Sequence, residues 1–158
     1  MTKNDDILPS TEERVAVNTS DAINRRIRQR TEAVLAYFAD HPDEIGRHLA
    51  RLDREWDIER TLEANAASFT LLGLTLAINR DSRWLALPVG VAAFLLQHAL
   101  QGWCPPVPVL RRLGVRTTAE INRERYALKY LRGDFRDKLT PQGSAREKAR
   151  QALAAAEA

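Results

Sequence analysis

The chain of 158 residues has little of what marks many common protein classes. Its single cysteine, Cys104, excludes an internal disulfide and gives no indication of compartment. Glycine and proline are scarce, with seven of each, and no segment alternates apolar and polar residues as a half-buried strand does. Alanine and leucine dominate instead. These absences argue against a β-rich fold and predict an all-α protein.

The patterns of common active sites are missing as well. We find no Gly-rich phosphate loop, no pair of catalytic carboxylates and no nucleophile–base arrangement. We therefore expect no enzymatic activity, no catalytic residue and no cofactor. The polar, acidic stretch from Met1 to Ser20 lacks the apolar segment of a signal peptide, so no signal peptide is expected.

Charge is absent from two long apolar runs, Ala64 to Ile78 and Trp84 to Leu100, which a short polar segment separates. A helix needs about 20 mostly apolar residues to cross a bilayer, because each residue adds about 1.5 Å across a core of about 30 Å. The sequence therefore predicts a two-helix transmembrane hairpin, with arms at about 58–78 and 84–103. A soluble bundle that buries both runs as core helices remains an alternative.

The predicted hairpin has candidate anchors and candidate packing residues. Trp84 and Trp103 stand about 28 Å apart along a continuous helix, a separation that suits the two membrane interfaces. At the start of the first arm, Arg60 and Glu63 are one turn apart and are expected to pair at the level of the headgroups. Small residues spaced four apart are expected to pack the arms together: Gly73 with Ala77, and Ala86 with Gly90.

Positive charge is concentrated outside the hairpin and predicts its orientation. From Arg111 to Arg150 the chain has twelve Lys/Arg against five Asp/Glu, whereas the turn has only Arg80 and Arg83. The positive-inside rule then predicts a multi-pass membrane protein with both termini in the cytoplasm. The same rule accounts for the basic stretch after the second arm, so no nucleic-acid partner is expected. The flanking arginines are Arg47, Arg51, Arg54 and Arg60 before the hairpin, and Arg111, Arg112, Arg116, Arg123 and Arg125 after it.

Amphipathic cytoplasmic helices are expected on both sides of the hairpin. Residues 20–57 are predicted to form two helices, the second leading into the first arm and packing a stripe that includes Trp56 against the first. Residues 116–133 read as a helix that opens with a capping box at Thr117 and Glu120 and stops at Gly133. We expect a disordered N-terminus over residues 1–19 and a mobile tail over residues 134–158.

The segment from Ile58 to Val115 resembles the YgaP-like transmembrane domain, a bacterial inner-membrane family of unknown function. The resemblance implies a hairpin that can dimerise in the bacterial inner membrane. Some members carry a rhodanese domain with a catalytic cysteine, but nothing here reads as such a domain, so sulfurtransferase activity is not carried over. The matching features are Glu59-Arg60, Gly73, Gly102-Trp103-Cys104-Pro105, Leu110 and Leu113-Gly114.

Two residues near the end of the second arm are candidates for chemistry. One interpretation makes Cys104 an accessible thiol, with Arg111 and Arg112 nearby to favour its thiolate form. The other makes it a small residue that fits a tight turn. His98 can form a hydrogen bond to a neighbouring helix through its ring. Together with Cys104 it could supply two ligands of a metal site, and a dimer would bring the total to four. The simpler interpretation assigns neither residue to a metal or an active site. His41 and His48 are expected to be solvated.

The leading functional hypothesis is a membrane anchor or interaction module. Its expected partners are the lipid bilayer, a second copy bound through the hairpin, and an unidentified protein. One alternative is a small transporter or a sulfur-handling membrane component, by analogy with the rhodanese-linked relatives. The other is a soluble helical interaction protein.

Overall fold

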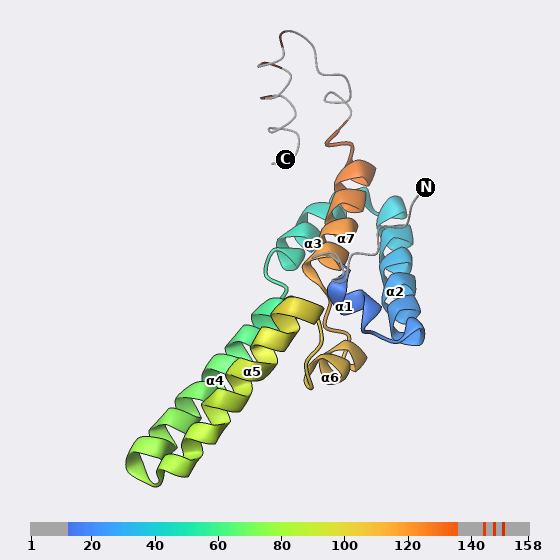
Figure 1. The fold of residues 1–158 in the computed structure, drawn as a ribbon. Coiled ribbons are helices and arrows are strands. Elements are labelled where there is room, and N and C mark those ends of the chain that lie inside the picture. Colours follow the sequence, from blue (N-terminus) through green and yellow to red (C-terminus); the bar gives the residue numbers. More distant parts are fainter. Residues whose placement is uncertain (1–12, 136–143, 145–146, 148–149, 151–158) are drawn as a thin grey trace. The chain divides into compact units, whose positions relative to one another are not determined.

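The computed structural model describes residues 13–135 together with residues 144, 147 and 150, and every element in these parts is a helix (Figure 1). The all-α fold class is therefore confirmed. Most of the tail expected over residues 134–158 lies outside the described residues. The elements are α1 (Arg14–Val17), α2 (Asp21–Asp40), η1 (Pro42–Glu44), α3 (Ile45–Leu52), α4 (Ile58–Asn79), η2 (Ser82–Leu85), α5 (Ala86–Gln101), α6 (Val107–Arg112) and α7 (Thr118–Arg132).

The described chain divides into two compact units. The first unit takes residues 13–30 and 55–121, and so holds α1, the start of α2, the hairpin and α6. The second takes residues 31–54 and the chain from residue 122 onward, with the rest of α2, α3 and most of α7. Each unit has its own buried residues.

The two apolar runs form an antiparallel hairpin of α4 and α5 (Figure 1). Asp57 caps α4 by accepting a hydrogen bond from the Arg60 N–H at 2.8 Å, and Asp81 starts η2 by accepting one from the Arg83 N–H at 2.8 Å. The predicted first arm is nearly that observed. The second arm ends at Gln101 rather than at Trp103, because Gly102 takes the left-handed conformation, with φ of 72°, and stops the helix.

Close packing within the hairpin is centred on Gly73. A Cβ atom at this position would lie 2.6 Å from Pro88 Cδ and 3.2 Å from Leu87 Cβ, so only glycine allows the two helices to approach this closely. The other arm contributes different residues from those expected. A Cβ at Gly90 would meet nothing within 4 Å, and Ala86 is exposed. The prediction that Ala86 and Gly90 pack against the first arm is therefore wrong, because Leu87 and Pro88 face Gly73 instead.

This difference predicts opposite outcomes for two glycine-to-alanine substitutions. Gly73→Ala is expected to lower hairpin stability by about 1–3 kcal/mol, because the added methyl group must displace the rigid ring of Pro88. Gly90→Ala is expected to be neutral or stabilising by up to about 1 kcal/mol, since alanine is the better helix former. Thermal unfolding followed by circular dichroism measures both, and equal melting temperatures for the two variants would contradict the packing.

The core of the first unit lies at the base of the hairpin. Val15, Ile58, Leu62, Cys104 and Val107 form one buried cluster, with Leu110 and Val115 packed against it. Val15, from α1, is only 2% exposed, so residues 13–19 are not the disordered segment that their polar composition predicted. A single buried valine together with polar contacts to the hairpin orders this short helix, and its four residues are too few to show a helical period in the sequence.

The second unit is organised by the amphipathic helix α3. Ile45, Leu49 and Leu52 are buried as their spacing predicts, and Phe38 lies against His48 with ring centroids 4.7 Å apart. His48 was expected to be solvated, but its Nε2 lies 2.7 Å from Glu124 Oε1, and the Glu124 side chain is 3% exposed. His41, by contrast, is exposed.

The helix of residues 45–52 was predicted to lead into the first arm, but the structure shows a break between them. It ends at Leu52, and an extended Asp57 with ψ of 175° starts a new helix. Trp56 therefore lies beyond the apolar stripe, is 49% exposed and stacks under the Arg60 guanidinium, which is 4.5 Å from the ring centroid. Trp56 was expected to pack against the first of the two helices predicted in residues 20–57, and Arg60 was expected to pair with Glu63; the described residues show the Trp56–Arg60 contact in place of both.

Candidate functional site

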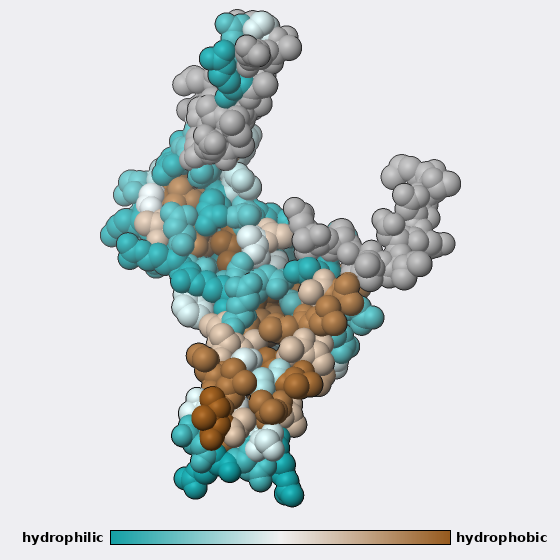
Figure 2. All heavy atoms as spheres, turned by 60° about the vertical axis from the view of Figure 1, so that its left-hand side comes forward, coloured by the Kyte–Doolittle hydropathy of each residue, from teal (hydrophilic) through white to brown (hydrophobic). Residues whose placement is uncertain are grey.

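The most distinctive surface of the described chain is the apolar exterior of the hairpin. α4 has 22 residues and η2 with α5 has 20, and both segments are long enough and apolar enough to cross a membrane. Only 11% and 6% of their apolar windows are buried. Figure 2 shows apolar residues gathered over the hairpin and hydrophilic ones at its turn. Its large exposed residues are Phe69, Leu71, Leu72, Leu74, Ile78, Leu85, Val89, Phe94, Leu96 and Leu100.

Four polar side chains within α4 donate hydrogen bonds to their own helix. Asn65, Ser68, Thr75 and Asn79 each donate a hydrogen bond of 2.8 Å to the carbonyl oxygen four residues earlier. A polar group in an apolar medium is costly unless it is bonded in this way. These four residues are therefore compatible with a surface that contacts lipid or another apolar partner.

Tryptophan occurs at both ends of the hairpin, though not as the sequence predicted. Trp84 lies in η2 at the turn and is 45% exposed, in keeping with its expected position. Trp103 follows the left-handed Gly102, so it is outside α5 and half-buried rather than the last residue of the arm. Trp56, just before α4, is a second aromatic residue at the base of the hairpin. Trp56 was not predicted there, because its spacing placed it in the amphipathic stripe of the preceding helix.

A charged cluster closes the base of the hairpin. Glu59, from α4, accepts a hydrogen bond from Arg14 Nη2 at 2.9 Å, and its other oxygen lies 3.0 Å from His98 Nε2 of α5. His98 is 4% exposed, and its Nδ1 is buried without a hydrogen-bond partner among the described residues. A proton on Nε2 fits this geometry, because His98 then donates a hydrogen bond to Glu59.

Helix α1 completes this cluster by capping the carboxyl end of α5. Arg14 Nη1 donates to the Ala99 carbonyl at 3.2 Å, and Asn18 Nδ2 donates to the Gln101 carbonyl at 2.7 Å. The last carbonyls of a helix lack partners within it and carry partial negative charge, so a cation and an amide donor are well suited to them. A Cβ on Gly102 would lie 2.5 Å from the Arg14 backbone, which shows how closely α1 approaches.

Cys104 lies in the apolar core rather than on the surface. Its side chain is 3% exposed, and burial raises the pKa of the thiol. The backbone N–H of Val107 opposes this shift, whereas the negative charge of Glu59 adds to it. The thiol is therefore neutral near pH 7, which favours the structural reading of Cys104 over the reactive one.

The structure does not combine His98 and Cys104 in a metal site. His98 is bonded to Glu59 and Cys104 belongs to the apolar cluster. Among the residues that the structure describes, no group of three or more His, Cys, Asp and Glu side chains could hold a metal ion.

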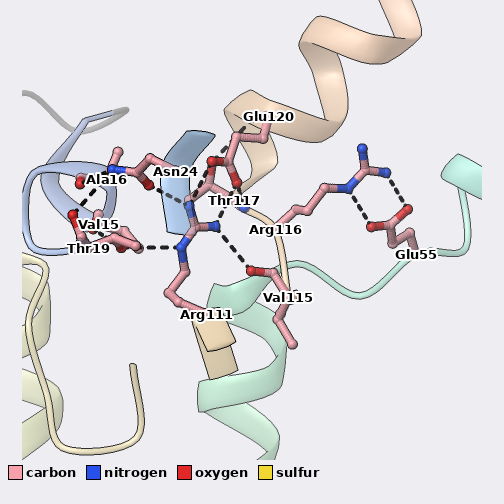
Figure 3. Close-up of polar contacts among 10 residues, drawn as sticks. All are labelled: Val15, Ala16, Thr19, Asn24, Glu55, Arg111, Val115, Arg116, Thr117 and Glu120. Atoms are coloured by element: carbon pink, nitrogen blue, oxygen red, sulfur yellow. Dashed lines mark hydrogen bonds and ion pairs between the residues drawn. The ribbon is translucent and has the colours of Figure 1, made fainter. Parts of the chain in front are cut away.

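Arg111 forms the centre of a second polar network (Figure 3). Its side chain is 0% exposed and makes a two-pronged contact with Glu120, with both N–O distances 2.7 Å. The same guanidinium donates to Thr19 Oγ1 at 3.2 Å, Asn24 Oδ1 at 3.0 Å and the Val115 carbonyl at 3.0 Å. Every edge of this buried cation is therefore bonded, and it joins the segment after α1, the start of α2, α6 and the start of α7.

The capping box predicted from Thr117 and Glu120 is part of this network. The Thr117 N–H donates to Glu120 Oε2 at 2.9 Å, and the Glu120 N–H donates to Thr117 Oγ1 at 3.2 Å. α7 then runs to Arg132 and stops at Gly133, with φ of 90°, as predicted. Next to it, Arg116 makes its own two-pronged pair with Glu55, at 2.8 and 2.6 Å.

Glu120 gives this network a defined acid sensitivity. Burial acts to raise the pKa of Glu120, but its bonds from Arg111 and Thr117 outweigh burial and hold it below the ordinary 4.5. A carboxylate with a lowered folded pKa stabilises the fold fully above its unfolded pKa, and this stability is lost as pH falls through the folded pKa.

The expected result is a pH-dependent difference between the wild type and Glu120→Gln. The wild type should melt at a higher temperature near pH 7, and the difference should shrink progressively below pH 4.5. Melting curves from pH 7 to pH 3 measure it. Glu32→Gln, which alters an exposed residue of α2, provides the control. A difference that stays constant over this range would contradict the assignment.

Comparison with known proteins finds no match to the chain: no family model, no curated protein and no solved structure is similar to it at a significant level. The functional assignment therefore depends on the residues and geometry described above.

Proposed function

We propose that this chain is a small integral membrane protein in which the α4–α5 hairpin crosses the bilayer and serves as an anchor or interaction module. The observation that carries this proposal is the exposure of the hairpin. A core helix of a soluble protein is mostly buried, whereas only 11% and 6% of these two apolar windows are. Exposed apolar surface on this scale is typical of a membrane or protein contact.

The dimensions and end groups of the hairpin support a membrane rather than a protein groove. α4, with 22 residues, is about 33 Å long, close to the thickness of a bilayer core. Charged residues of the hairpin occur only near its base and at its turn: Glu59, Arg60 and Glu63 at the base, and Arg80, Asp81 and Arg83 at the turn. The excess of arginine outside the turn supports cytoplasmic termini, and the YgaP-like resemblance supports the bacterial inner membrane.

The small residues that do not pack within the hairpin suit a contact with a second copy. Ala86 is exposed and Gly90 has no neighbour within 4 Å of its absent Cβ, so this part of α5 can approach another helix closely. If the protein dimerises there, Gly90→Leu should weaken dimerisation in detergent, as measured by light scattering. Unchanged dimerisation would mean that another surface is used.

The alternatives receive less support. The buried, neutral thiol of Cys104 offers no starting point for sulfur transfer, which leaves that hypothesis resting on the resemblance alone. A soluble interaction protein would need a partner that covers nearly the whole hairpin. Such a partner would also have to accommodate an apolar surface on both helices.

Extraction of cell membranes with alkaline carbonate tests the proposal. An integral hairpin stays in the pellet, and release of the chain into the wash would overturn the proposal. Orientation needs a new cysteine, because Cys104 is buried. In a Cys104→Ser background, Ser82→Cys at the exposed turn should react with an impermeant maleimide from outside the cytoplasm.

A further inference from the structure

A basic groove lies in the first unit, beside the base of the hairpin. Its volume is about 200 Å³, well above the roughly 10–15 Å³ that a cavity needs to hold one water. It is formed by the start of α2, the end of α6 and the segment after it. No acidic residue lines the groove. The lining residues are Ile23, Arg26, Ile27, Arg30, Arg111, Arg112, Leu113, Gly114 and Arg116.

The arginines of this groove fall into two groups. Arg111 and Arg116 are bonded to Glu120 and Glu55, and so their charges are already matched. Arg26, Arg30 and Arg112 are exposed, and the described residues provide them with no ion pair or hydrogen bond. Three unmatched cations that converge on one hollow repel one another, and an anion bound between them would relieve that repulsion.

The floor and walls of the groove are held in place. Arg111 is fully bonded beneath it, and Gly114 has φ of 87°. A Cβ at Gly114 would lie 3.8 Å from Arg30 Nη1, so the Arg30 guanidinium lies next to the backbone at this point. Leu113, which is 75% exposed, together with Ile23 and Ile27 supplies apolar surface next to the charges.

We propose that this groove binds a phosphate group, with Arg26, Arg30 and Arg112 as its ligands. Guanidinium groups bind phosphate through paired, charge-assisted hydrogen bonds, and three of them match a dianionic head better than a carboxylate. The phosphate comes from an anionic lipid headgroup or from a soluble phosphate compound. The lipid source rests on the proposed membrane function, whereas the phosphate chemistry rests on the groove alone.

Titration calorimetry on the full chain in an uncharged detergent tests the proposal. The probes are dihexanoyl phosphatidic acid, inorganic phosphate and, as a zwitterionic control, dihexanoyl phosphatidylcholine. Phosphatidic acid should bind, and phosphatidylcholine should not. The triple variant Arg26→Gln/Arg30→Gln/Arg112→Gln should bind phosphatidic acid about tenfold or more weakly. It should fold normally because the three side chains have no described partner.

A matched triple separates a site from general attraction to positive charge. Arg25→Gln/Arg28→Gln/Arg123→Gln removes the same charge from exposed positions outside the groove, and should change affinity by less than about twofold. Equal weakening by both triples, or no weakening by the groove triple, would overturn the proposal. So would equal binding of phosphatidic acid and phosphatidylcholine by the wild type.

The source of the phosphate follows from the relative affinities. Phosphatidic acid that binds at least about tenfold more tightly than inorganic phosphate indicates a lipid headgroup beside the apolar residues, and equal affinities indicate a soluble compound. Both results support the phosphate site. Carbonate extraction is a separate readout: if the wild type washes off membranes but the groove triple loses phosphate binding, the membrane proposal fails and the groove proposal survives.

Discussion

Replacing Arg111 with methionine is expected to lower the free energy of unfolding by about 3–5 kcal/mol. The substitution removes a cation that is 0% exposed and leaves the half-buried Glu120 carboxylate, together with Thr19 and Asn24, without their main donor. Breaking one side of a buried ion pair is far more costly than the net value of the pair, since the remaining charge stays desolvated. Urea unfolding followed by tryptophan fluorescence measures the loss.

Two further variants identify the cause of this loss. Arg112→Met alters the exposed neighbour, which has no described partner, and is expected to change stability by no more than about 0.5 kcal/mol. The double variant Arg111→Met/Glu120→Met should regain part of the stability, because it removes the orphaned charge as well. A loss below about 1 kcal/mol for Arg111→Met alone would show that the network is not a stabilising centre.

Two aspartates placed on the hairpin exterior are expected to release the chain from the membrane. Leu71 and Val89 are 66% and 68% exposed and lie well inside the arms. An aspartate near the centre of a membrane helix costs about 2.5–3.5 kcal/mol, so Leu71→Asp/Val89→Asp should oppose insertion by about 5 kcal/mol or more. The fraction of chain that resists carbonate extraction measures this effect.

The same double variant distinguishes a hairpin in the membrane from a hairpin that faces water. If the hairpin faced water, two exposed substitutions would each change stability by about 0.5 kcal/mol or less and would improve solubility. Asn79→Asp/Ser82→Asp adds the same charge at the polar turn and should leave extraction unchanged. Equal extraction of the two double variants would contradict a transmembrane hairpin.

Local signals in the sequence predicted much of the fold. The two uncharged runs predicted α4 and α5, the Thr117–Glu120 pair predicted the start of α7, and Gly133 predicted its end. These features depend on residues close together in the chain, where spacing determines which side chains meet. Gly73 could also be predicted as a packing residue, because a small residue within an apolar helix has few other roles.

Contacts between distant segments could not be predicted in the same way. The bonds of Arg111 to Thr19 and Asn24 join residues 92 and 87 positions apart, and in the sequence Arg111 looked like one more arginine on the cytoplasmic side. Nothing in the pattern around Arg14 indicates that it reaches Glu59. The residues that face Gly73 were likewise mispredicted, because Leu87 and Pro88 of α5 meet it where Ala86 and Gly90 were expected.

The capping of α5 by α1 affects where this protein can be shortened. A polar first segment invites removal up to residue 20, where the first long helix begins. Such a truncation would delete Arg14 and Asn18, which bond the last carbonyls of α5, and would leave Glu59 paired with His98 alone. It would also remove Val15 from the core cluster. Versions made for expression or for fusion to a reporter should therefore begin before Glu13.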